Sequence, residues 1–261
     1  MNPRYIYMAI VLSLSYVLFF QWGQEQKTKE IDAEQARAEI EVDGLGDISI
    51  LENDLLKISV NNQNGLIVES RLKEFPVYPG SQRGVRVLGF GEDSSSGDPA
   101  LKYYLKSGFG GLNKNKPFPF KIVSSSASKI VLESQEFGVR KTISLSDVPY
   151  EINVFDENLS GVGYKPYIAL YRNDALPIDM PTGFFTNASY RGVAFNTKDD
   201  PYNNTRLRAL DEPQVYRQNG GWVAFIQKYF MASVLGSSDY DYSYFANPRS
   251  DSGLYSMGYF V

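Results

Sequence analysis

From residue 48 onward, apolar and polar residues alternate with a period of two, and this alternation constrains the fold more than any other feature of the sequence. The clearest example is the pair of segments 139–145 and 150–154, which a turn at 147–149 separates. One face of the first segment carries Val139, Lys141, Ile143 and Leu145. Half-buried antiparallel strands have this pattern, because successive side chains point to opposite faces of a sheet.

Further strands are predicted along the rest of the chain. Residues 56–60 and 66–72 are expected to form a hairpin, because Asn64-Gly65 between them readily adopts the positive φ that such a turn can need. The loop-rich stretch that follows is expected to contain one or two short strands, around 85–88 and 101–105. Five more strands are predicted later, at 167–171, 190–195, 222–226, 229–235 and 254–261. Many short strands with hardly any helical periodicity predict an all-β sandwich of antiparallel strands.

The first 22 residues have a different character. Tyr5–Trp22 has no formal charge, and as a helix it would be roughly 27 Å long, which is close to the thickness of a bilayer core. Tyr5 and Trp22 would lie at the two interfaces, and Arg4 favours a cytoplasmic amino terminus. A cleavable signal peptide needs a small-x-small motif after the apolar run, whereas Phe19-Phe20-Gln21-Trp22 stands there. We therefore predict a transmembrane signal anchor over 1–22.

Residues 23–47 are dense in Glu, Gln, Lys and Ala and have few apolar residues. Nothing in this segment forms an apolar stripe that could face a core, so it is interpreted as a polar linker between membrane and domain. The β domain is then expected to cover 48–261, with everything after Gly23 outside the cytoplasm.

The composition excludes several functional classes. The chain has no cysteine and no histidine, which removes thiol nucleophiles, Ser-His-Asp hydrolysis and nearly all zinc sites. The net charge of −4 without a basic run argues against nucleic-acid binding. The acidic pairs Asp199-Asp200 and Asp239/Asp241 could suggest a calcium site or a glycosidase site. They lie among turn-forming residues, however, and lack the spacing of an EF-hand. No metal, cofactor or catalytic residue is predicted.

Three passages carry a resemblance to a known family: the anchor with its polar linker, the paired segments from Lys141 to Asn158, and the stretch from Phe184 to Phe230. The last contains Tyr190-Arg191-Gly192-Val193-Ala194-Phe195, followed by Gly220-Gly221-Trp222 leading into Gln227-Lys228-Tyr229-Phe230. In order and content these passages resemble the amino-terminal half of the YidC branch of the YidC/Oxa/Alb insertases of Gram-negative bacteria.

This resemblance implies a periplasmic domain with a mutarotase-like β-supersandwich, held by one helix in the bacterial inner membrane. It also implies a role in inserting and folding inner-membrane proteins, with the Sec translocon and its accessory subunits or without them. In that family the insertase activity resides in a later membrane core of five helices, which these 261 residues do not contain. The chain is therefore expected to be a non-catalytic scaffold portion that ends within a strand, as a fragment would.

Three residues are candidates for contact with a partner or for lining a cleft. Arg191 is either a cleft residue or an arginine satisfied by carboxylates and carbonyls at a strand end, and the second interpretation is favoured. Trp222 could stack on a sugar ring, but a tryptophan after two glycines more often fills a core. The same core placement is expected for Tyr229-Phe230.

Two alternative functions stay open at this point. A membrane-anchored carbohydrate-binding module could use the same fold, although the epimerase version lacks the necessary histidine. A general periplasmic chaperone would need a broad exposed apolar cleft.

Overall fold

The computed structural model describes residues 15–16, 47–77, 79–91, 101–110, 119–161, 163, 165–174, 190–227 and 229–261. From residue 47 onward, the described residues form a succession of β-strands with one short 3₁₀ helix, η2 (Leu207–Ala209). The strands are β1 (Ile48–Glu52), β2 (Leu56–Asn61), β3 (Ile67–Pro76), β4 (Gly84–Gly91), β5 (Leu101–Gly110), β6 (Lys121–Ser125), β7 (Lys129–Ser134), β8 (Val139–Leu145), β9 (Ile152–Asn158), β10 (Lys165–Arg172), β11 (Arg191–Phe195), β12 (Asn203–Arg206), β13 (Gln214–Asn219), β14 (Trp222–Gln227), β15 (Phe230–Leu235), β16 (Asp241–Asn247) and β17 (Tyr255–Phe260).

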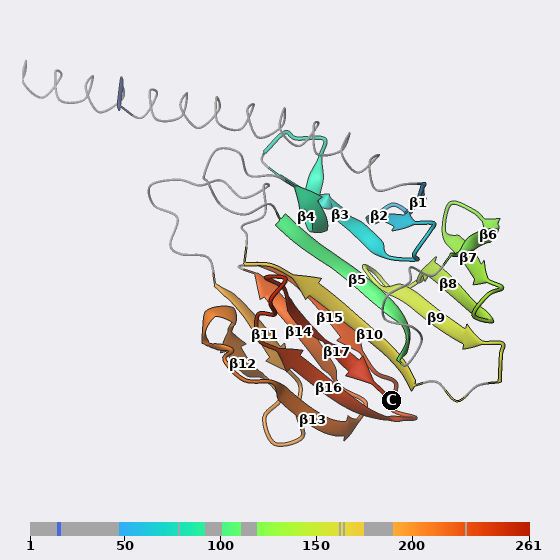
Figure 1. Cartoon of the computed structure of the whole chain (residues 1–261). Helices are drawn as coiled ribbons and strands as arrows, with labels where there is room; N and C mark the ends of the chain where they lie inside the picture. The colour runs from blue at the N-terminus through green and yellow to red at the C-terminus, as the bar shows by residue number, and fades with distance from the viewer. Residues whose placement is uncertain are drawn as a thin grey trace, which may run out of the picture.

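The strands form three antiparallel sheets (Figure 1). The largest has nine strands in the order β1-β2-β3-β4-β5-β10-β17-β16-β13. Two four-stranded sheets have the orders β12-β11-β14-β15 and β6-β7-β8-β9. The prediction of an all-β fold with antiparallel sheets is confirmed, whereas the finer comparison with a mutarotase-like supersandwich stays a prediction.

One continuous hydrophobic core joins the three sheets. Its buried members include Ile58 of β2, Ile143 of β8 and Phe225 of β14, each at most 1% exposed. Because strand side chains alternate between faces, each sheet presents one apolar row to this core. The apolar residues that recur with a period of two in the sequence therefore lie on the buried face of each sheet.

The predicted hairpin at 56–72 is present as β2 and β3, and Gly65 has the expected positive φ of 66°. The strands expected at 85–88 and 101–105 are also present, but both are longer, as β4 and β5. Six strands were not predicted: β1, β6, β7, β12, β13 and β16. Asp241, expected in a turn, is the first residue of β16. All five residues of β6 are exposed, so that strand has no buried face to give it an alternating pattern.

The last strand in the sequence, β17, lies inside the nine-stranded sheet between β10 and β16 (Figure 1). Gly258 occupies the middle of β17, opposite Ala169 of β10 and Phe245 of β16. A Cβ atom at this position would lie 2.0 Å from the carbonyl oxygen of Ile168. The sheet therefore requires glycine here for close approach of two backbones.

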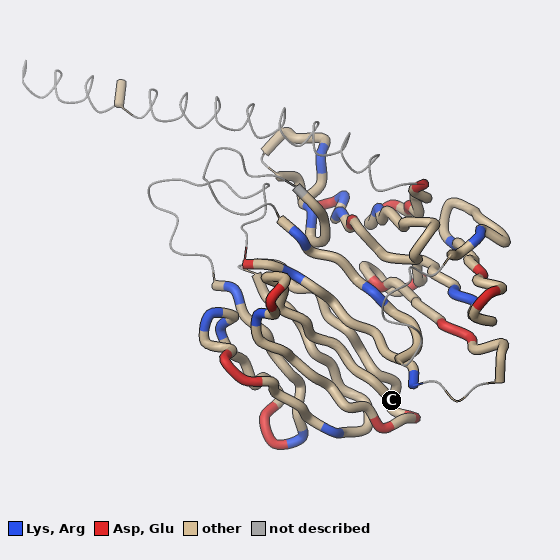
Figure 2. The backbone as a smooth tube through the Cα atoms, in the orientation of Figure 1, with Lys and Arg blue, Asp and Glu red and all other residues tan. Residues whose placement is uncertain are grey.

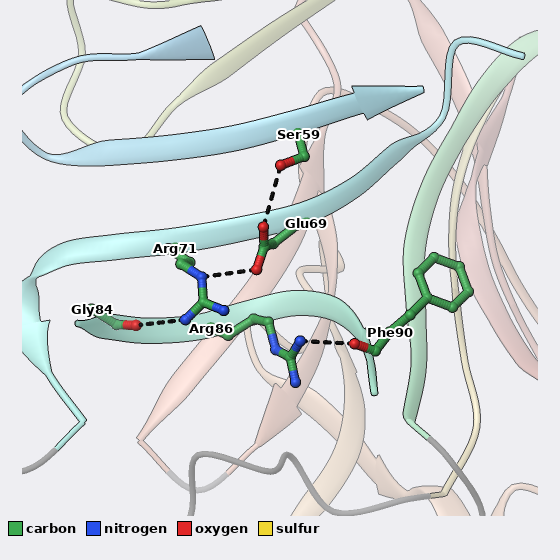
Figure 3. A network of polar contacts seen from close by, with 6 residues as sticks. All are labelled: Ser59, Glu69, Arg71, Gly84, Arg86 and Phe90. Atoms are coloured by element: carbon green, nitrogen blue, oxygen red, sulfur yellow. Dashed lines mark hydrogen bonds and ion pairs between the residues drawn. The ribbon is translucent and has the colours of Figure 1, made fainter. Parts of the chain in front are cut away.

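A buried polar network crosses β2, β3 and β4, and its members are shown in Figure 3: Ser59, Glu69, Arg71, Gly84, Arg86 and Phe90. The Glu69 carboxylate accepts hydrogen bonds from Arg71 Nε (2.8 Å) and from Ser59 Oγ (3.2 Å). Arg71 also donates to the Gly84 carbonyl (3.3 Å), and Arg86 donates to the Phe90 carbonyl (2.7 Å). These charge-assisted bonds tie three neighbouring strands together through their side chains as well as their backbones.

Candidate interaction surface

Of the three candidate residues, Arg191 and Trp222 belong to the sheet β12-β11-β14-β15 and Tyr229 lies between its strands β14 and β15, but they do not converge on one cleft. Arg191 begins β11 and lies opposite Gln227, two residues before Tyr229, so these two candidates share one end of the sheet. Trp222 begins β14, and five residues of extended strand, about 17 Å, separate it from Gln227. The sheet thus offers two separate surfaces.

Arg191 is engaged by a single aspartate. Its Nη1 donates to the Asp174 carbonyl (2.5 Å), and its Nε lies 3.3 Å from Asp174 Oδ1. The other carboxylate oxygen of Asp174 accepts a hydrogen bond from Arg208 Nε (2.9 Å). Asp174 therefore bridges two arginines at the strand end, and the Arg191 guanidinium is held in place by this bridge.

A third arginine lies near this bridge but inside the sandwich. Arg172 is 0% exposed, and its guanidinium lies 4.9 Å from the centre of the Tyr103 ring and 5.7 Å from that of Phe225. Its Nε donates to the Asn173 carbonyl (3.2 Å), whereas Nη1 and Nη2 have no hydrogen-bond partner within the described part of the chain. Burial lowers the pKa of Arg172. Cation–π contact takes the place of the missing hydrogen bonds.

Trp222 does not fill the core, so that expectation was wrong. Its neighbours Val223 and Phe225 face the core, which places Trp222 on the outer face of β14, where it is half-buried opposite Leu235. Its ring lies 6.5 Å from that of Tyr202, and the two ring planes are inclined by 55°. Two rings at this angle do not form the flat platform on which a sugar would stack.

Tyr229 is 80% exposed, so its predicted core placement was also wrong. The next residue, Phe230, packs inward in an edge-to-face contact with Phe75 of β3 (5.8 Å between ring centres). Phe75 in turn contacts Tyr150 in the β8–β9 turn (6.0 Å). An aromatic cluster, Phe75–Tyr150–Phe230, thus joins all three sheets at the start of β15.

Tyr150 has a φ of 62°, which is the left-handed region that residues with a side chain rarely adopt. Its hydroxyl donates a hydrogen bond to Glu74 (2.8 Å), and this bond raises the pKa of Tyr150. The contacts with Phe75 and Glu74 hold the residue in this conformation. Strain of this kind persists only where surrounding contacts fix the backbone.

The strand β15 next to this cluster is an uncharged edge of its sheet, which sequence reasoning did not identify. The residues Phe230–Leu235 contain no Lys, Arg, Asp or Glu, and the same holds for β14 and β17 (Figure 2). Its residues Met231 and Leu235 are 50% and 61% exposed. The lack of charge is visible in the sequence, but its position at an edge is not.

One member of each acidic pair serves a turn in the structure. Asp200 accepts a hydrogen bond from the Tyr202 amide (3.1 Å), and Asp239 accepts one from the Ser237 hydroxyl (2.9 Å). Among the residues described above, no group of three or more acidic side chains could hold a metal ion.

The predicted membrane anchor, with Arg4, Tyr5 and Trp22, lies outside the described residues, except for Ser15 and Tyr16, which are helical. The linker up to residue 46 lies outside them as well. In the portion of the chain that is described, no helix has the length and apolar character needed to cross a membrane.

The sequence matches the model of a known protein family. The family model described as the YidC periplasmic domain matches residues 49–261, from the second residue of β1 through the end of β17.

Proposed function

The chain belongs to the YidC periplasmic domain family, and on this basis we propose that it is the amino-terminal, membrane-tethered part of a membrane protein insertase. In this proposal the protein assists the insertion and folding of bacterial inner-membrane proteins, with the Sec translocon or without it. The portion described here acts as a periplasmic scaffold that contacts partners and performs no catalysis. The observation that carries the proposal is the family match over nearly all of the strands.

The proposed topology has one span, a cytoplasmic amino terminus and a periplasmic β domain. It is supported by the uncharged segment Tyr5–Trp22, by Arg4 before it and by the polar linker after it. Protease treatment of spheroplasts should digest the domain while the cytoplasm stays sealed. A domain that resists digestion until the cells are lysed would contradict this topology.

The absence of histidine and cysteine from the sequence supports the non-catalytic part of the proposal. Without these side chains, general acid–base and nucleophilic catalysis are left to carboxylates, lysine or tyrosine. The alternative of a carbohydrate-binding module predicts binding to a glycan array at micromolar strength. We expect no binding, because Trp222 and Tyr202 are inclined rather than coplanar.

Site-specific photo-crosslinking in cells tests the scaffold role directly. A photoreactive phenylalanine analogue at Tyr229, which is highly exposed beside the aromatic cluster, is expected to crosslink to inner-membrane proteins or to Sec subunits. The same analogue at Tyr240, which is also exposed but lies in the turn after β15, is the matched control and should capture fewer of them. If neither position captures a membrane protein, and none co-purifies from detergent, the scaffold role is wrong.

A further inference from the structure

The edge of the β15 strand presents main-chain groups that another strand could bind. The Gly236 amide donates to the Gly221 carbonyl (3.1 Å), which fixes the alternation of hydrogen-bonded pairs between β14 and β15. By this alternation the backbone groups of Phe230, Ala232 and Val234 point toward β14, and those of Met231, Ser233 and Leu235 point away from it. The described residues form no hydrogen bond to these outward groups.

The other five sheet edges in the described structure each carry at least one charged residue. The charged residues are Glu52 in β1, Lys121 in β6, Asp156 and Glu157 in β9, Arg206 in β12 and Arg217 in β13. Charges on edge strands discourage pairing with other chains. β15 has neither charge nor proline, so it is the one edge of these sheets that lacks this protection.

The side chains along β15 also favour an added strand. Met231 and Leu235 project from the outer face, opposite Ile226 and Trp222 of β14. An added strand would place alternate residues beside these apolar side chains. A charged residue there would meet no counter-charge on β14 or β15, so the bound segment should be uncharged.

The surroundings of β15 favour a single peptide strand over a second copy of the domain. At the start of β15, Phe230 contacts Phe75, and Phe75 contacts Tyr150, so elements of the two other sheets lie next to this end of the strand. One extended strand needs only about 5 Å beside β15. A second copy paired through the same edge would bring its own aromatic cluster and two further sheets into this space.

We propose that β15 is a docking edge for an extended, uncharged peptide segment of a partner protein, which adds to the sheet beside β15 as a fifth strand. Main-chain hydrogen bonds would supply affinity, and apolar side chains at alternate positions would supply selectivity. This inference deepens the proposed scaffold role. It rests on that role in one respect, namely that a partner protein of the scaffold supplies the peptide.

A binding assay with the full chain in lipid nanodiscs tests the proposal. The probe is a fluorescein-labelled synthetic peptide of alternating valine and threonine, and the same peptide with a central proline is its control. We expect saturable binding of the first peptide only, with slower hydrogen exchange at the amides of Met231, Ser233 and Leu235. Unchanged exchange at these amides in the presence of bound peptide would overturn the proposal.

Matched variants locate the binding site. Met231→Lys places a charge on the β15 edge and should weaken peptide binding about tenfold. Val215→Lys is the control, because Val215 is 53% exposed on the β13 edge, which already contains Arg217. It should leave affinity unchanged. Equal effects of the two variants would overturn the proposal, and Leu235→Lys replaces Met231→Lys if the latter does not fold.

Sedimentation of the chain without peptide tests whether a second copy of the chain occupies the β15 edge instead. A concentration-dependent dimer that protects the Met231, Ser233 and Leu235 amides would show that a second copy occupies the edge, which contradicts the proposal. The peptide assay uses no cellular partner, so its failure leaves the crosslinking test of the scaffold role intact. Equally, peptide binding without cellular crosslinks would reject the scaffold role alone.

Discussion

Lys141 of β8 lies directly opposite Asp156 of β9, and 2.6 Å separates its Nζ from the Asp156 carboxylate. Both side chains are almost completely buried. The same ammonium group donates to the carbonyl oxygen of Ser107 in β5 (3.1 Å) and to the Ser107 hydroxyl. One buried cation therefore connects the sheet β6–β9 to the nine-stranded sheet.

Removal of the aspartate should destabilise the domain strongly. Burial lowers the pKa of Lys141 because the ammonium is costly to desolvate, and Asp156 opposes this effect. Asp156→Ala leaves the buried charge without its counter-ion, so we expect the free energy of unfolding to fall by about 3–5 kcal/mol. Urea denaturation measures this change. Asp147→Ala, in the exposed β8–β9 turn, is the control and should cost less than about 0.5 kcal/mol.

The cluster of tyrosines on β16 and β17 should make the domain sensitive to alkaline pH. Burial raises the pKa of Tyr259 to about 12, and neighbouring Tyr242 and Asp156 add to this shift. Since the folded pKa exceeds that of an unfolded tyrosine, about 10, the stabilisation is complete below pH 10 and is lost as pH rises toward 12. Tyr259→Phe should therefore reduce the loss of stability over this range. Urea midpoints and tyrosinate absorbance as a function of pH provide the test, and an unchanged pH dependence would contradict this assignment.

Arg172 should be replaceable by an apolar side chain of similar length. Its Nη1 and Nη2 lack hydrogen bonds in the described structure, and the hydroxyl of Tyr103 beneath it lacks one too. Arg172→Met removes a buried charge and should leave the free energy of unfolding unchanged or raise it by about 1–2 kcal/mol. Arg172→Lys should lower it, because an ammonium is more strongly hydrated than a guanidinium. Thermal denaturation distinguishes these outcomes.

Arg206 supplies the control for this comparison, because it also lies over an aromatic ring, that of Tyr190 (5.8 Å), but on an exposed strand. Arg206→Met should change stability by less than about 0.5 kcal/mol. A loss of more than about 2 kcal/mol in Arg172→Met would mean that the cation itself stabilises the fold.

The close approach at Gly258 should tolerate no side chain. Gly258→Ala forces apart β17 and β10 at the Ile168 carbonyl, so we expect a loss of about 3 kcal/mol or failure to fold. Gly163→Ala adds the same methyl group where no atom of the described residues lies within 4 Å, and it should be neutral or slightly stabilising. Circular dichroism during thermal unfolding compares the two. Equal stability of both variants would show that the sheet can move to accept the methyl group.

The sequence predicts those features that depend on neighbouring residues. Asn64-Gly65 indicates the β2–β3 hairpin, and the alternation around Lys141 places that lysine on a buried face. Its partner Ser107 comes from another sheet, and no local pattern points to it. The same limit explains why the alternation did not reveal that β15 is an edge.

Trp222 and Tyr229 were misplaced for a related reason. Aromatic residues favour burial on average, but the face on which a residue lies depends on the phase of the alternation. Val223 and Phe225 take the inner positions of β14, which leaves Trp222 outside. Tyr229 lies between two strands, where the alternation no longer applies.

The central place of β17 sets the order in which this domain can be completed during synthesis. β10 emerges from the ribosome before β13 and β16, yet it shares no strand pairing with either of them until β17 is inserted between them. The two halves of the large sheet must therefore wait, with open edges, for residues 255–260 to follow. During this interval a nascent chain is open to mispairing, so its protection matters most just before β17 arrives.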